Sequence, residues 1–183
     1  MKIVHYVLSE TFAGIEQHVE ELSKTQTTNN EVTVICNPSI SRYFSHATVI
    51  QVSNISRRSI FGIFKLLGTI SKLKPDIVHS HGSKTTSIIN SVKKIINLNH
   101  VCSVHGIKSN TKVYSKADAV IAGSIKIQDS LNVSSHLVEN WWHPSLPKSI
   151  EKTNEYILAI GRLEPVKGFD LLIKSWVGID KKL

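Results

Sequence analysis

The stretch DIVHSHGSKTTSIINSVKKII, residues 76–96, decides the fold class. Its first part predicts a buried strand at 76–81, and its second part predicts a helix at about 85–96. Pro75 ends the helix predicted over 60–73, because the residue before a proline is driven out of the helical region. A strand therefore lies between two helices, which is typical of a parallel sheet with crossover helices.

The same alternation continues on both sides of this stretch. Further strands are predicted at 3–8, 31–36, 46–52, 100–104 and 119–122, and further helices near 15–22 and 124–131. This order predicts an α/β fold with a doubly wound parallel sheet, in which a functional site lies at the carboxyl ends of the strands. The loops that carry Gly14, His81 and His105 all belong to that end of the predicted sheet.

The apolar periodicity stops after a first domain that we expect to span residues 1–143. Residues 144–154 are rich in proline and charge, which is typical of a linker. Residues 155–183 then predict one strand, 156–161, and one helix after Gly168. One strand and one helix cannot bury a core, so we expect this part to be the opening of an incomplete second domain.

Composition narrows the class of protein. The chain has 183 residues, of which 41% are hydrophobic and 20% charged, and this excludes a disordered chain. A formal net charge of +8 favours phosphates, nucleic acid or an anionic membrane without choosing among them. The cations are dispersed rather than clustered with aromatic residues, so we expect no nucleic-acid partner. Cys36 and Cys102 lack a metal-ligand spacing, which favours reduced thiols and a cytoplasmic protein.

Histidines gather near the predicted edge of the sheet. His79 and His81 share one face of their strand because side chains alternate with a period of two, and His105 follows the next strand. Three imidazoles could bind zinc in a metal hydrolase, but these loops supply no clear carboxylate base, and a hydrogen-bonding role for His79 is the simpler interpretation. His105 is the best candidate for polar chemistry, since its imidazole can donate to a substrate oxygen.

The loop from Gly161 to Gly168 holds a second group of candidates. Arg162 can bind two oxygens of a diphosphate and Lys167 adds a point charge, while the N-terminus of the following helix adds its positive end. The alternative is two solvated cations on a surface loop. At the first turn, Gly14 either brings backbone amides close to an anion or serves only a tight turn.

In their order along the chain, these segments resemble the retaining glycosyltransferases of the GT-B fold, group 1, also called family 4. AGIEQH at 13–18 resembles the family's G-G-x-E stretch, and DIVHSHG at 76–82 resembles its D-[IV]-[IV]-H-x-H segment. SVHG at 103–106 and ADAVIAGS at 117–124 resemble its T-x-H-G and A-D-x-[IV]-I-[AT]-x-S segments. IGRLEPVKGFDLL at 160–172 resembles the V-G-R-L-x-x-x-K-G-x-D-x-L opening of the family's second domain.

The resemblance implies two Rossmann-like domains, the first binding mostly the acceptor and the second mostly a nucleotide-diphosphate sugar. It also implies transfer with retention of the anomeric configuration, without a metal or another cofactor. The partners would be the nucleotide-sugar donor and a glycan or lipid-linked acceptor, in cell-surface polysaccharide or lipopolysaccharide synthesis. The implied site residues are Gly14, Gly161, Arg162 and Lys167 for the donor, His105 as the catalytic contact to the transferred sugar, and Glu16 and His81 on the acceptor side.

The chain departs from the family pattern at three places. Ala13 replaces the first glycine of the G-G pair, and Asn140-Trp141-Trp142 replaces the usual N-G-V ending of the first domain. The E-x7-E motif that holds the donor sugar and ribose in the family does not occur before Leu183. We therefore expect a fragment that does not transfer a sugar by itself.

A non-catalytic module that docks on an anionic membrane or on a partner transferase is the alternative function. Residues 57–65, RRSIFGIFK, combine cations with apolar and aromatic residues, which would suit a peripheral position on the inner face of the membrane. The preferred interpretation is that Phe61 and Phe64 are core residues of an ordinary helix.

Overall fold

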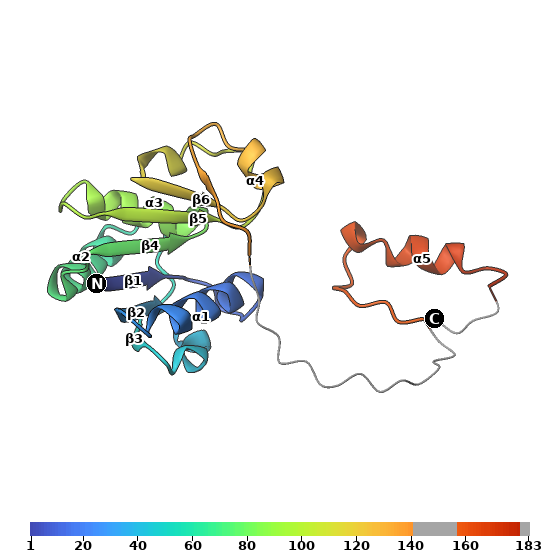
Figure 1. Cartoon of the computed structure of the whole chain (residues 1–183), viewed down its shortest axis with the longest axis horizontal. Helices are drawn as coiled ribbons and strands as arrows, with labels where there is room; N and C mark the ends of the chain where they lie inside the picture. The colour runs from blue at the N-terminus through green and yellow to red at the C-terminus, as the bar shows by residue number, and fades with distance from the viewer. Residues whose placement is uncertain (141–156, 180–183) are drawn as a thin grey trace. The chain divides into compact units, whose positions relative to one another are not determined.

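The computed structural model describes residues 1–140 and 157–179 (Figure 1). The chain divides into two compact units, Met1–His143 and Pro144–Leu183. Each unit is described by itself. The linker predicted at 144–154 lies outside the described residues.

The first unit is built on a seven-stranded sheet in which each pair of neighbouring strands is parallel. The strands are β1 (Lys2–Tyr6), β2 (Glu31–Cys36), β3 (Thr48–Gln51), β4 (Ile77–His81), β5 (His100–Val104), β6 (Ala119–Ala122) and β7 (His136–Leu137). Their order across the sheet is β3-β2-β1-β4-β5-β6-β7. The chain changes direction across the sheet between β1 and β4, and crevices at such switch points bind ligands in α/β proteins.

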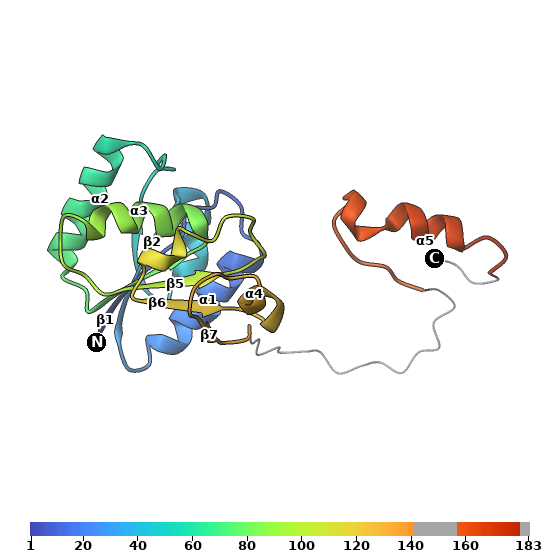
Figure 2. The ribbon, with the colours of Figure 1, turned by 90° about the horizontal axis from the view of Figure 1, so that it is seen from above.

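Helices cover both faces of this sheet. They are α1 (Gly14–Gln26), α2 (Ile60–Leu73), α3 (Ser83–Lys93) and α4 (Ile125–Asp129), with the 3-10 helices η1 (Pro38–Phe44) and η2 (Tyr114–Lys116). Figure 2 shows α2 and α3 on one side of the sheet and α1 and α4 on the other. Leu66 and Ile88 belong to the core under α2 and α3, whereas Val19 of α1 packs with Val34 and Phe44. The predicted doubly wound, Rossmann-like fold is confirmed.

The bounds of α2, β5 and β6 agree with the sequence predictions. Helix α3 begins earlier than predicted, at Ser83, because Gly82 takes a left-handed φ of 85° and turns the chain from strand to helix. The 3-10 helices and β7 were not predicted. Helix η1 starts where Asn37 Oδ1 accepts from the Ser39 N–H at 3.0 Å, and β7 has only two residues, both exposed, so it carries no apolar pattern.

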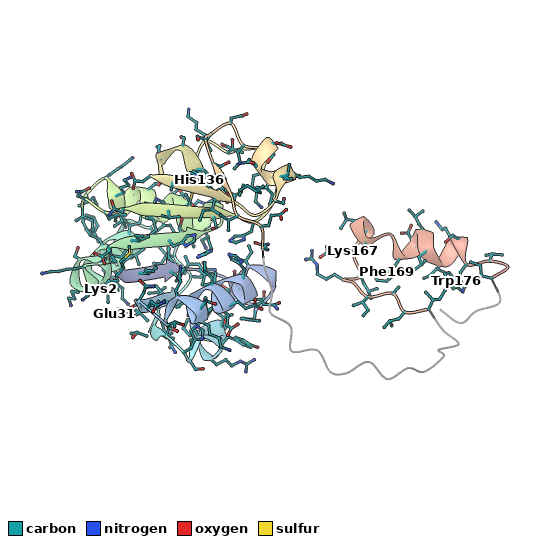
Figure 3. All side chains as sticks on the ribbon, in the orientation of Figure 1. Lys2, Glu31, His136, Lys167, Phe169 and Trp176 are labelled. Carbon is teal, nitrogen blue, oxygen red and sulfur yellow. The ribbon has the colours of Figure 1, made fainter. Side chains whose placement is uncertain are left out.

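The described part of the second unit contains η3 (Pro165–Lys167) and α5 (Phe169–Ser175). The strand predicted at 156–161 is not formed over the described residues 157–161, so that prediction is wrong there. A strand needs a neighbour for its N–H and C=O groups, and the described residues of this unit offer none. Figure 3 labels Phe169, whose ring lies so close to Gly161 that a Cβ there would meet it at 3.2 Å.

Cys36 and Cys102 are buried, free thiols in different parts of the core, as predicted. Among the helices of the described ranges, none has the length and apolar character needed to cross a membrane.

Candidate functional site

A row of histidines lies on one face of the central strands at their carboxyl ends. His5 on β1 stands in register with His79 on β4, and His81 follows two residues later on the same face. The ring centroids of His79 and His81 are 4.3 Å apart, and those of His5 and His79 are 5.2 Å apart. His105, just after β5, completes the row. The predicted meeting of His79, His81 and His105 is therefore observed, and the structure adds His5.

Three hydrogen bonds link three of the histidines into a continuous network that starts at Gln26 on α1. Gln26 Oε1 lies 2.6 Å from His5 Nε2, and His5 Nδ1 lies 3.1 Å from His81 Nε2. His81 Nδ1 lies 3.2 Å from His105 Nε2. A neutral imidazole has one N–H and one bare nitrogen, so with Gln26 accepting, each histidine in turn donates through Nε2. This direction leaves His105 Nδ1 bare, able to accept from a substrate hydroxyl.

Burial keeps this row of histidines uncharged. It lowers the pKa of His5 to about 4 and that of His105 to about 4. It also lowers the pKa values of His79 and His81 well below the usual range, and the neighbouring imidazoles act in the same direction. Near neutral pH, the His105 ring is therefore a neutral polar group and not a cationic acid.

The row of histidines lies between two cavities. One, of about 240 Å³, opens at the carboxyl ends of β4 and β5 and is lined by His81 and His105. The other, of about 220 Å³, lies on the α1 face and is lined by His18, His79 and His105. His105 lines both cavities. Because its Nδ1 is bare, the ring can accept a hydrogen bond from a substrate there, whereas the sequence analysis expected it to donate one. The ring of His18 lies 5.1 Å from that of His105.

Glu16 fixes the turn that carries Gly14. Its carboxylate is buried, with a residue exposure of 2%, and accepts from the Ala13 N–H at 2.9 Å and from the Ser9 hydroxyl. Gly14 itself is exposed at the start of α1, and a Cβ there would meet nothing within 4 Å. Glu16 thus shapes the β1–α1 turn, and both of its contacts are internal.

Gly161, Arg162 and Lys167 belong to the second unit. Arg162 pairs with Glu164 at 3.0 Å on the same loop, and both side chains are largely exposed, so this pair holds Arg162 only weakly. Lys167 is exposed on η3 (Figure 3). Gly168 ends η3 at a φ of 65°, which returns the chain into α5. The structure therefore places these three residues together within the second unit.

The three histidines whose geometry comes nearest to a zinc site are not the three predicted, because His5 takes the place of His105. One ring nitrogen from each of His5, His79 and His81 lies within 4.8 Å of the others, all three being buried. These nitrogens already have partners, however: His5 and His81 bond to each other, and His79 Nε2 lies 2.8 Å from Ser103 Oγ. A tetrahedral zinc also needs a fourth ligand, and among the described residues no carboxylate lies with these three histidines.

We expect the purified protein to contain no stoichiometric zinc, because the imidazole nitrogens satisfy one another. Elemental analysis of protein purified without chelators provides the measurement. One zinc per chain that disappears in His5→Gln would contradict this expectation.

Sequence reasoning missed His5 and Gln26. His5 is a single histidine within the apolar run at 3–8, and nothing near it in the sequence marks it as part of a site. The signal lies in the pairing of β1 with β4, since two parallel neighbours place residues in register on the same face.

Comparisons with known proteins agree with this architecture. A family model described as Glycosyltransferase Family 4 matches residues 12–134, more than half of the chain. No match was found among curated proteins.

Several solved structures share the fold. HepE of Anabaena, in complex with UDP and glucose, has a TM-score of 0.66 at 17% identity, covering 78% of this chain and 45% of that one. A glycosyltransferase of Rickettsia africae ESF-5 has a TM-score of 0.62 at 17% identity, over 75% and 42%. The lipopolysaccharide outer core galactosyltransferase WaaB has a TM-score of 0.57 at 19% identity, over 71% and 41%. The chain thus spans less than half the length of these proteins.

Proposed function

The chain belongs to glycosyltransferase family 4, and we propose that it is the acceptor-side part of an enzyme that transfers a hexose or related sugar from a nucleotide-sugar donor. The acceptor is a glycan or a glycolipid, and transfer retains the anomeric configuration without a metal. The family match carries the proposal, because residues 12–134 include Gly14, His81 and His105 at the carboxyl ends of the strands. Solved relatives bind UDP and glucose, or act on the lipopolysaccharide outer core, which supports cell-surface glycan synthesis.

In this proposal His105 contacts the transferred sugar. Its Nδ1 accepts from a sugar hydroxyl, while the hydrogen bond from Nε2 to His81 fixes the orientation of the ring. Arg162 and Lys167 of the second unit neutralise the charge that develops on the donor diphosphate as its bond to the sugar breaks. Gly14, exposed at the start of α1, lets backbone amides approach an anion. On the acceptor side, Glu16 fixes the β1–α1 turn through its hydrogen bonds, and His81 orients the ring of His105.

The proposal is tested by joining residues 1–143 to the donor domain of a family 4 enzyme that uses UDP-glucose. Release of UDP is the readout, because water can replace an unidentified acceptor. We expect UDP release that exceeds the rate of the donor domain alone. Equal rates for the fusion and the isolated donor domain would contradict the proposal.

Exposed aromatic residues on α2 favour a second candidate function, a module that docks on an anionic membrane. The preferred sequence interpretation, that Phe61 and Phe64 are core residues, is wrong: their exposures are 83% and 57%, and Ile60 is 72% exposed. Leu66 and Ile70 supply the buried face of α2, so the aromatic residues are left on its outer side. Arg57 and Arg58 are also exposed just before this helix. A cytoplasmic protein held peripherally on the membrane would use this surface.

We expect the protein to co-sediment with vesicles of anionic phospholipid at low salt, and the double variant Phe61→Ser, Phe64→Ser to lose most of this binding. Each exposed aromatic side chain supplies apolar area to the lipid interface, and the cations supply the attraction to the headgroups. Ile125→Ser is the matched control, because Ile125 is a comparably exposed apolar residue on α4. An equal loss of vesicle binding in Ile125→Ser, or vesicle binding that persists in the double variant, would contradict membrane docking by this surface of α2.

A further inference from the structure

Two histidines of the row, His5 and His81, use both ring nitrogens within the network of hydrogen bonds. His5 bonds to Gln26 through Nε2 and to His81 through Nδ1. His81 bonds to His105 through its own Nδ1. The His5 and His81 rings are buried, and no other hydrogen bond joins their nitrogens to the described residues. The network therefore has two ends, the Gln26 amide on α1 and Nδ1 of His105.

Only two arrangements of protons keep every bond of this network made. A neutral imidazole that bonds through both nitrogens donates with one and accepts with the other, so the donors all point the same way along the network. In one arrangement each Nε2 carries the proton, and Nδ1 of His105 is bare. In the other each Nδ1 carries the proton, and His105 presents an N–H. A mixed arrangement sets two N–H groups or two bare nitrogens against each other, which is costly in a buried place.

Gln26 is the end of the network that can select between the two arrangements. It is the last residue of α1, and helical spacing places it on the same stripe as His18 and Leu22, which also line the cavity on the α1 face. Its carbonyl oxygen Oε1 lies 2.6 Å from His5 Nε2. Burial lowers the pKa of His5, and the hydrogen bond to Gln26 opposes this shift, as an accepting oxygen does. This oxygen cannot donate, so it keeps the proton on His5 Nε2.

We propose that Gln26 sets the tautomer of His105 and thereby the kind of group that His105 binds. Its importance for sugar transfer rests on the proposed transferase function. With Nδ1 bare, His105 favours a substrate group that donates, such as a sugar hydroxyl, over a group that only accepts. Gln26 is then a positioning residue, because it acts on the substrate through the two buried rings between its amide and His105.

Gln26→Lys and Gln26→Glu test this role, because an ammonium only donates and a carboxylate only accepts. ¹⁵N spectra of the imidazole rings in the 183-residue chain at pH 8 show which nitrogen carries the proton in each ring. We expect His5, His81 and His105 to be Nε2–H tautomers in wild type and in Gln26→Glu. In Gln26→Lys we expect His105 to change to the Nδ1–H tautomer. Gln17→Lys is the matched control, because Gln17 is exposed on the same helix and lines neither cavity beside the row.

The fusion of residues 1–143 with a family 4 donor domain gives a second measurement. We expect Gln26→Lys to lower kcat for UDP release roughly tenfold, the effect of one lost hydrogen bond, and Gln26→Glu to escape this loss.

An Nδ1–H tautomer of His105 in wild type would overturn the proposal, and this spectrum decides even where Gln26→Lys does not fold. The same His105 tautomer in Gln26→Lys and Gln17→Lys would also overturn it. Both results would leave the transferase function standing. A wild-type fusion that releases no more UDP than the donor domain alone would contradict the transferase function instead, and the tautomers would still decide the role of Gln26.

Discussion

Replacing His105 with alanine is expected to lower the rate of UDP release about 100-fold in the fusion of residues 1–143 with a family 4 donor domain. A positioned polar group has an effect of this size on the stability of a transition state. His105 lines both cavities beside the switch point of the sheet, and burial lowers its pKa to about 4, so the ring is neutral throughout the physiological range. Because the chemical contact is lost, the change should appear in kcat rather than in the KM for UDP-glucose.

In the proposed function, His81 acts on the same reaction through His105, as a positioning residue. His81→Ala removes the acceptor of the His105 Nε2–H bond, so we expect a smaller loss of kcat than in His105→Ala and no further loss when the two changes are combined. His136→Ala is the matched control, because His136 is an exposed histidine on β7 that takes no part in the row (Figure 3). A fusion that keeps its full rate after His105→Ala would remove this residue from the mechanism.

The second large effect is a loss of stability in mild acid. The buried histidines have pKa values lowered from 6.5 in the folded protein, with His5 at about 4. Between these two values the unfolded chain binds more protons than the folded chain, so stability is full above pH 6.5 and falls as the pH is lowered through it. For His5 alone the loss at pH 5 is roughly 2 kcal/mol, and the other buried histidines act in the same direction.

Urea unfolding of the 183-residue chain at pH 7.5 and pH 5 measures this effect. We expect the free energy of unfolding to drop by several kcal/mol in wild type, and by less in His5→Gln, which has one buried imidazole fewer. His136→Gln should leave the drop unchanged. A free energy of unfolding that is equal at the two pH values would show that the histidines are not buried in the neutral form.

The sequence was sufficient for elements in which local and global signals agree. The apolar face of α2 and its proline stop predicted the bounds of that helix, and the period of two placed His79 and His81 on one face. It was insufficient where a partner distant in sequence decides the outcome. His5 meets His81 across 76 positions because β1 pairs with β4, and no local pattern encodes that pairing.

The surface of α2 and the loop before α5 are two places where the sequence prediction was wrong for the same reason, a dependence on residues distant in sequence. Phe61 and Phe64 have the spacing of core residues, but Leu66 and Ile70 form the buried face of α2. Hydrophobicity alone therefore predicted burial for two side chains that are exposed. Residues 157–161 have the composition of a strand, but the described residues of their unit offer no strand to pair with, and hydrogen bonding to a neighbour is what makes a strand.

Sugar transfer by the 183-residue polypeptide itself tests the central claim, that these residues form the acceptor side of a two-part site. The purified chain is incubated with labelled nucleotide sugars and with glycan and glycolipid acceptors, and the labelled product is counted against a sample without protein. We predict no transfer, because Arg162 and Lys167 alone do not make a donor site. Transfer above background that is lost in His105→Ala would show a complete active site within these residues and would contradict the account.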